Sequence, residues 1–149
     1  MKPATATASP VQIGRKSRRK GRAGECEIAG ILRDLLGVNA KRRVRQHDGD
    51  SDLEGLDGWS VEVKRAKTPA IPAWWRQTVE QASTSKLRPV LFYRVDRREW
   101  RAIWPLQAAL FPEIADICGL LEPRPHFFPV ESGIEAWAMV YRETIEVRP

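Results

Sequence analysis

Three charged side chains between residues 52 and 64 have the spacing of a metal-dependent hydrolytic site. Asp52 stands ten residues before the triplet Glu62-Val63-Lys64. Side chains alternate between the two faces of a strand, so Glu62 and Lys64 would share one face about 7 Å apart. Carboxylates can hold a divalent cation, and a nearby ammonium can act on a cation-bound water. This pattern favours the hydrolysis of phosphodiesters, the chemistry of a nuclease.

The position of Asp52 depends on the turn that precedes Glu62. A two-residue turn at 57–58 would pair Asp52 with Val63 and send its carboxylate to the wrong face. A three-residue loop at 56–58, with Gly58 left-handed, would pair Asp52 with Glu62 on the same face. The nuclease interpretation requires the second register or an equivalent bulge. Taken alone, the Glu-x-Lys triplet is equally typical of a surface salt-bridge ladder.

The elements that must position these residues follow an α-β-β-β-α-β-β order, which indicates a mixed α/β or α+β fold. The first helix carries an apolar stripe at helical spacing and ends before Gly37. The expected elements are a helix at 21–36, a strand at 42–46, a hairpin of 52–55 with 59–66, a helix at 74–83, and strands at 89–95 and 100–104.

Three regions are expected along the chain. Residues 1–14 are small, polar and proline-bearing, and residues 1–18 are predicted to form a disordered basic tail. Residues 19–104 form the predicted core, and residues 105–149 a C-terminal extension packed on the same domain. Within the extension we expect a helix over 106–117 and a final strand over 137–141.

Two glutamates on the first helix differ in their expected orientation. The centre of the apolar stripe lies about 50° from Glu25 and about 110° from Glu27. Glu25 should lean toward the sheet, and Glu27 toward solvent. A carboxylate at the rim of a core-facing stripe needs a partner or a metal. Stabilisation of the helix N-terminus is the alternative explanation for Glu25.

The charge is distributed unevenly along the chain. Residues 1–45 hold 12 Lys and Arg against 3 Asp and Glu, whereas the remainder holds 13 against 16. Six of the eight residues at 15–22 are basic, which favours a polyanionic partner such as a nucleic acid. A solubilising tail or a patch for anionic lipid is the alternative interpretation of this run.

Several classes of protein do not fit the sequence. No run approaches the roughly 20 apolar residues of a membrane span, and the N-terminus lacks the apolar region of a secretion signal. Cys26 and Cys118 are far apart and have no partner spacing for zinc. We therefore expect no membrane association, and a reducing cytoplasm as the location.

The segments 20–28, 51–53 and 61–64, together with Arg45, resemble the archaeal-type Holliday junction resolvases and their phage relatives. These belong to the restriction-endonuclease-like PD-(D/E)xK superfamily, and the resemblance covers about residues 19–104. It implies a central mixed β-sheet flanked by helices. The sequence departs from the pattern at Ser51, where a proline would be expected, and in the extra acids Glu54 and Asp57.

The resemblance also implies roles for individual residues. Asp52, Glu62 and the Val63 carbonyl would hold Mg²⁺, for which Mn²⁺ could substitute, and no small-molecule cofactor is implied. Lys64 would be the catalytic lysine. Glu25 would be the helix carboxylate, binding a second ion or acting through water. Gln77 would be the helical glutamine that faces the site, with Gln81 as the second choice.

The implied partner is branched double-stranded DNA, a four-way junction cut by a homodimer inside a bacterial or phage-infected cell. Trp74 and Trp75 are expected to pack rather than to stack on bases. Alternatives are a less specialised nuclease of this fold, acting on flaps, nicks or duplex, and a non-catalytic nucleic-acid-binding module. The residues expected to clamp DNA phosphates are Arg18, Arg19, Lys20, Arg22, Arg42, Arg43 and Arg45.

Overall fold

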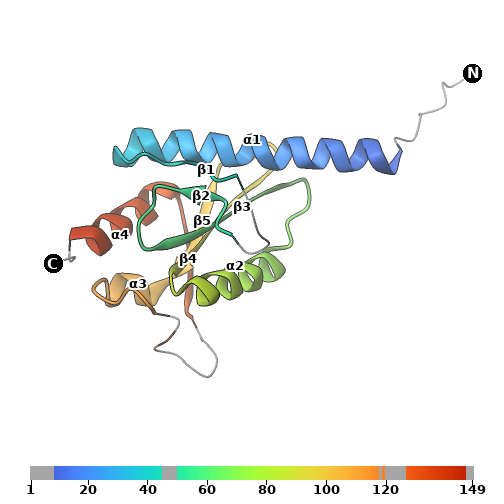
Figure 1. Ribbon diagram of the computed structural model, residues 1–149. Helices are drawn as coiled ribbons and strands as arrows, with labels where there is room; N and C mark the ends of the chain where they lie inside the picture. Colours follow the sequence, from blue (N-terminus) through green and yellow to red (C-terminus); the bar gives the residue numbers. More distant parts are fainter. Residues whose placement is uncertain (1–8, 45–49, 118, 120–126, 147–149) are drawn as a thin grey trace, which may run out of the picture.

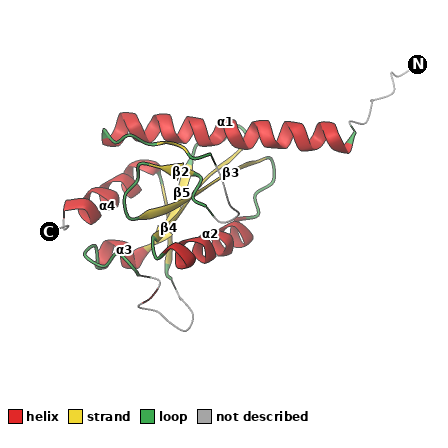
Figure 2. Cartoon of the chain, in the orientation of Figure 1, coloured by secondary structure: helices red, strands yellow, loops and turns green. Residues whose placement is uncertain are grey.

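The computed structural model describes residues 9–44, 50–117, 119 and 127–146. A four-stranded sheet of order β3-β4-β5-β6 forms its centre, and β1 and β2 form a separate two-stranded sheet (Figures 1 and 2). The elements are α1 (Pro10–Leu36), β1 (Lys41–Arg42), β2 (Leu53–Glu54), β3 (Trp59–Ala66), α2 (Ile71–Ser85), β4 (Arg88–Val95), β5 (Arg101–Pro105), α3 (Leu106–Leu110), β6 (Pro129–Ser132) and α4 (Ile134–Glu146).

The sheet combines one parallel with two antiparallel pairings. β3 pairs in parallel with β4, while β5 is antiparallel to both β4 and β6. Parallel neighbours need a crossover connection, and α2 supplies it. The α-β-β-β-α-β-β order predicted for the core is confirmed, and so is the mixed α+β fold with helices flanking a mixed sheet.

The two faces of the sheet pack against different helices. Val61 and Val63 point into the main core, which also contains Ile28 of α1 and Trp137 of α4. On the other face, Trp74 and Trp75 of α2 pack with a smaller cluster of Leu91, Tyr93 and Ile103, in agreement with the packing role expected for the tryptophans. Glu62 and Lys64 lie on this second face.

Helix α1 begins at Pro10, eleven residues before the expected start at Gly21. The Ser9 hydroxyl accepts a hydrogen bond from the Gln12 N–H, and the Gln12 side chain accepts one from the Ser9 N–H. This reciprocal cap satisfies orphan donors, and proline is favoured at the first helical position. Residues 10–18 are therefore helical instead of a disordered tail, and Figure 1 shows this end of α1 extending beyond the body of the protein.

The hairpin predicted before β3 does not form as a paired ladder. β2 pairs with β1 instead, and the expected strand at 42–46 is limited to Lys41–Arg42, with its part from residue 45 outside the described residues. The turn before β3 has 57–58 at its centre, because the Trp59 N–H donates to the Leu56 carbonyl and Gly58 has a left-handed φ of 81°. This is the two-residue alternative and not the three-residue loop at 56–58.

The C-terminal extension differs most from expectation. The predicted helix at 106–117 is limited to α3, which ends at Leu110. The predicted strand at 137–141 is helix α4, because Ile134, Trp137, Ala138 and Tyr141 repeat at helical spacing and are all buried. β6 pairs with β5 at the edge of the sheet. No helix in the described ranges is long and apolar enough to cross a membrane.

Candidate active site

Asp52 lies against the free edge of β3, the edge that does not pair with β4. Its backbone N–H donates to the Val61 carbonyl at 2.8 Å, and its carboxylate accepts the Val63 N–H at 2.7 Å. The N–H and C=O of one strand residue point to the same edge. The Val63 carbonyl therefore lies at the edge that carries the Asp52 carboxylate. Neither of the two registers considered for Asp52 occurs, but the carboxylate still reaches the backbone beside Glu62.

Ser51 has a structural role that the sequence reasoning missed. Its hydroxyl accepts the Val61 N–H at 2.9 Å and donates to the Leu53 carbonyl at 2.8 Å. The side chains of Ser51 and Asp52 thus satisfy two successive donors of β3 that a pairing strand would otherwise satisfy. The signal was available, since serine hydroxyls commonly bond to nearby backbone.

Glu62 lies at the centre of a polar group on the α2 face of the sheet. Its side chain is fully buried, and one carboxylate oxygen lies 2.6 Å from the Lys64 Nζ. The Gln77 amide donates to the same oxygen at 3.4 Å, so α2 contributes directly to the group. Gln81, the second choice, bonds instead to the buried Ser60 hydroxyl one turn away. The structure therefore brings together Glu62, Lys64 and Gln77.

The two helix glutamates both have arginine partners. The Glu25 carboxylate accepts from Arg42 of β1 at 2.6 Å, with a side chain only 14% exposed. Glu27 was expected to face solvent, but it bonds to Arg94 of β4 at 2.7 Å and lies 3.9 Å from Arg65 of β3. The Glu27 side chain is 37% exposed, more than that of Glu25 as expected, but an arginine from the sheet reaches over the rim of the stripe and binds it. The role of Glu25 at a metal remains a prediction.

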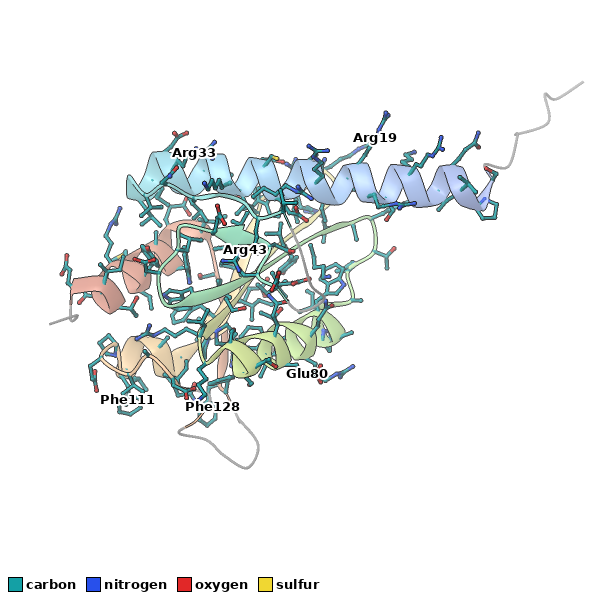
Figure 3. The ribbon with its side chains drawn as sticks, viewed as in Figure 1. Arg19, Arg33, Arg43, Glu80, Phe111 and Phe128 are labelled. Carbon is teal, nitrogen blue, oxygen red and sulfur yellow. The ribbon has the colours of Figure 1, made fainter. Side chains whose placement is uncertain are left out.

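The basic residues expected to clamp DNA fall into two groups. Arg18, Arg19 and Arg22 are exposed on α1, and Arg19 points away from the body of the protein in Figure 3. Lys20 instead bonds to both oxygens of Asp96 at 2.5 and 2.6 Å, and its ammonium holds the pKa of that carboxyl below its ordinary value.

The other clamp candidates lie near β1. Arg42 is engaged by Glu25, and Arg43 is half-buried with its Nε 3.9 Å from a Glu54 oxygen. Arg45 lies outside the described residues. Among the clamp candidates that the structure describes, the exposed ones that form no ion pair with another described residue therefore all lie on α1.

The donor set suits a hard divalent cation. Within the part of the chain that the structure describes, no three His, Cys, Asp or Glu side chains gather as a metal site. Asp52 and Glu62 are two buried carboxylates, Asp52 bonded to the Val63 N–H and Glu62 next to Val63 in sequence, and the Val63 carbonyl would be a third oxygen ligand. Mg²⁺ commonly uses one or two carboxylates and completes its shell with water and substrate oxygens. The residues present therefore fit Mg²⁺, and they do not fit a zinc site.

A mixed sheet with a crossover helix, carrying an Asp and a Glu-x-Lys triplet on and beside its first strand, defines the PD-(D/E)xK class of nucleases. Residues 16–122 match the family model described as "Phage putative PDDEXK endonuclease", and the chain belongs to this family. It is accordingly a nuclease of the PD-(D/E)xK type.

Two further comparisons accompany the family match. A comparison with curated proteins finds no match. Among solved structures, the chain is similar to Archaeoglobus fulgidus Hjc, a Holliday junction resolvase from an archaeal hyperthermophile. The two share 18% identity with a TM-score of 0.46, and the match covers 79% of this chain and 99% of that one.

Proposed function

We propose that this nuclease is a Mg²⁺-dependent, structure-specific endodeoxyribonuclease that cuts four-way DNA junctions as a homodimer in bacterial or phage-infected cells. The observation that supports it best is the buried Glu62 carboxylate, held at one oxygen by Lys64 and Gln77 beside the anchored Asp52. Buried carboxylates are costly unless partnered, so a fold that keeps one of them on Lys64 and a second one bonded to the Val63 N–H favours a catalytic use.

Each side chain has a task in this proposal. When bound, Mg²⁺ would polarise the scissile phosphate and lower the pKa of a water. Asp52 and Glu62, with the Val63 carbonyl, would hold the ion. Lys64, 26% exposed and next to Glu62, would either orient the attacking water as an ammonium or, as a neutral amine, take up its proton, and in its charged form would offset charge that develops on the phosphate. Gln77 would keep the Glu62 carboxylate in a single orientation.

The exposed basic face of α1 supports a branched substrate. Contacts from arginine to backbone phosphates give affinity and orientation but carry no base sequence. An enzyme that binds chiefly through such contacts must distinguish its substrate by shape. Two strands of a junction must be cut, and two copies related by a twofold axis would place one active site on each strand.

The test compares a labelled four-way junction with matched linear duplex, each with Mg²⁺ and with EDTA, for wild type and Asp52→Asn. Asparagine keeps an oxygen for the Val63 N–H and removes the charge, so folding should be preserved. We expect paired incisions only when wild-type protein acts on the junction in the presence of Mg²⁺. Linear duplex, EDTA and Asp52→Asn should each give no incision. Equal cutting of duplex would reduce the proposal to a general nuclease, and cutting by Asp52→Asn would overturn the site.

A further inference from the structure

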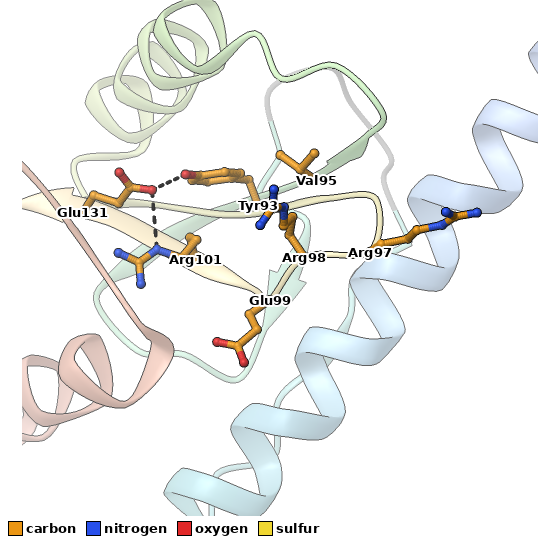
Figure 4. Close-up of a pocket in the computed structure, with 7 residues that line it drawn as sticks. All are labelled: Tyr93, Val95, Arg97, Arg98, Glu99, Arg101 and Glu131. Carbon is orange, nitrogen blue, oxygen red and sulfur yellow. Dashed lines mark hydrogen bonds and ion pairs between the residues drawn. The ribbon is translucent and has the colours of Figure 1, made fainter.

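An open basic pocket of about 710 Å³ lies beside the candidate active site and has no role in the chemistry proposed above. It is formed by the β4–β5 turn, by the adjoining ends of those strands and by one residue of β6 (Figure 4). Three arginines and two glutamates contribute to its wall, which favours an anionic ligand. The lining residues are Tyr93, Val95, Arg97, Arg98, Glu99, Arg101 and Glu131.

The strand register makes this pocket continuous with the active site. Lys64 of β3 is paired with Tyr93 of β4, which is in turn paired with Arg101 of β5. Paired residues project from the same face of a sheet, so the three side chains form one row. Neighbouring strands are about 4.8 Å apart, which places Arg101 roughly 10 Å from Lys64 across two strands.

The turn that carries the arginines is fixed before any ligand arrives. The Arg98 N–H donates to the Val95 carbonyl at 2.9 Å, and Arg97 adopts a left-handed φ of 63°. The ion pair between Lys20 and Asp96, which involves both carboxylate oxygens, connects this turn to α1. Arg97 and Arg98 are exposed, and the structure shows for neither an ion pair with another described residue. In Figure 4 the Arg98 side chain lies near Tyr93.

Glu131 is the residue of β6 that lines the pocket. Its carboxylate accepts the Tyr93 hydroxyl and lies 3.5 Å from the Arg101 Nε. Both members of the Arg101–Glu131 pair are nearly half exposed, at 43% and 46%. Exposed ion pairs contribute little to stability, so an incoming anion can replace Glu131 at small cost.

We propose that this pocket binds a backbone phosphate of the strand being cut, with Arg98 and Arg101 as its ligands and Glu131 as an internal competitor. The separation of about 10 Å between Lys64 and Arg101 means that this phosphate lies close to the scissile one on the same strand. Guanidinium groups suit the role because they present paired donors to phosphate oxygens. The inference rests on the proposed nuclease function, since the strand position is counted from the cut.

The first test measures junction affinity in EDTA, where binding is separated from cleavage. Arg98→Gln and Arg101→Gln should each weaken binding about 5- to 20-fold, as expected for a lost charge-assisted contact. Each should also reduce the slope of log K against log salt by about 0.9. Glu131→Gln should act in the opposite direction and tighten binding. Arg142→Gln on α4 is the matched control, because it removes the same charge outside the pocket.

The second test locates the phosphate with junctions that carry one neutral methylphosphonate. Moved one position at a time along the strand next to the cut, it should at one position weaken binding by wild type but not by Arg98→Gln or Arg101→Gln. The inference would be overturned if Arg98→Gln and Arg101→Gln bound the junction as tightly as Arg142→Gln. It would also be overturned if, at every position, the loss of affinity caused by the methylphosphonate simply added to the loss caused by each arginine substitution. If wild type binds but never cuts in Mg²⁺, the proposed function fails, while the comparison in EDTA still decides whether the pocket binds phosphate.

Discussion

The active-site group and the arginine pocket adjoin on one face of the sheet and share the Lys64–Tyr93 register, but they differ sharply in burial. The Asp52 and Glu62 side chains are 1% and 0% exposed and are bonded to backbone, lysine and glutamine. Arg101 and Glu131 are close to half exposed and loosely paired. Charges interact strongly where water is excluded and weakly where it is present. Burial suits groups that must act on a reacting phosphate, whereas exposure suits groups that must exchange one anion for another.

Neutralising either buried carboxylate should have the largest effect. Asp52→Asn and Glu62→Gln keep the shape of each side chain, so we expect cleavage to fall by about 10³-fold, the value of several kcal/mol of lost metal-assisted stabilisation. Junction affinity in EDTA should change little. Single-turnover cleavage and binding measured on the same preparations check this. Equal losses of binding and cleavage would instead mean that the buried group only maintains the fold.

Substitution of Lys64 should have the next largest effect. Lys64→Ala removes both the charge and the proton-transfer group, and we expect a decrease of about 10²-fold in the cleavage rate. Lys64→Arg restores the charge but cannot lose its proton at ordinary pH. If Lys64→Arg recovers only part of the cleavage rate lost in Lys64→Ala, the part that is not recovered is assigned to proton transfer. Pre-steady-state cleavage across pH is the measurement, and a full recovery would limit Lys64 to an electrostatic role.

Gln77 and Gln81 offer a matched pair on α2. Gln77 is exposed and bonds to Glu62, so Gln77→Ala should slow cleavage about tenfold and leave thermal stability unchanged. Gln81 is buried and bonds to Ser60, so Gln81→Ala should cost about 1–2 kcal/mol in the free energy of unfolding and leave the rate unchanged. Denaturant unfolding and cleavage assays on both variants check this. The reverse pattern would favour Gln81 as the functional glutamine.

The smallest effect is expected at Tyr93 on the boundary between the two regions. Burial, with Glu131 as the second cause, raises the Tyr93 pKa to about 12. An unfolded tyrosine titrates near 10, so the unfolded state releases its proton first and stability should fall as pH rises from about 10 to 12.

Glu131→Gln tests the two causes of this shift separately. It should lower the Tyr93 pKa but leave it above 10, because burial is the larger cause. Phenolate absorbance in a Tyr141→Phe background isolates this residue, as Tyr93 and Tyr141 are the two tyrosines of the chain. An unchanged pKa in Glu131→Gln would contradict the hydrogen bond between Tyr93 and Glu131.

The core was predictable from the sequence because local pattern and packing agree there. Val61 and Val63 alternate with Glu62 and Lys64, and that alternation places the pairs on opposite faces in the structure as well. Gln77 was predicted from the family resemblance alone, and its bond to Glu62 follows from the crossover that brings α2 over β3.

Other features depend on contacts that no local pattern encodes. The backbone N–H groups of Val61 and Val63 at the edge of β3 donate to the side chains of Ser51 and Asp52. These side-chain hydrogen bonds take the place of the backbone pairing of the expected hairpin. The capped start of α1 and the helical spacing of Ile134, Trp137, Ala138 and Tyr141 are both present in the sequence, but the predictions used only the composition of residues 1–14 and the short segment 137–141. The arginine pocket combines residues of β4, β5 and β6, and the pairing of β6 with β5 could not be inferred from its short proline-bearing segment.

The length of α1 sets a reach for the proposed enzyme. The helix has 27 residues, and its first buried residue is Gly24. The preceding part spans about 20 Å at 1.5 Å per residue, which equals roughly six base pairs at 3.4 Å each. The bonds from Lys20 to Asp96 and from Glu27 to Arg94 hold the helix at a constant angle to the sheet. The N-terminal part of α1 therefore lies at a fixed position relative to the sheet. A DNA arm shorter than about six base pairs would leave the basic N-terminal end of α1 without a phosphate to contact.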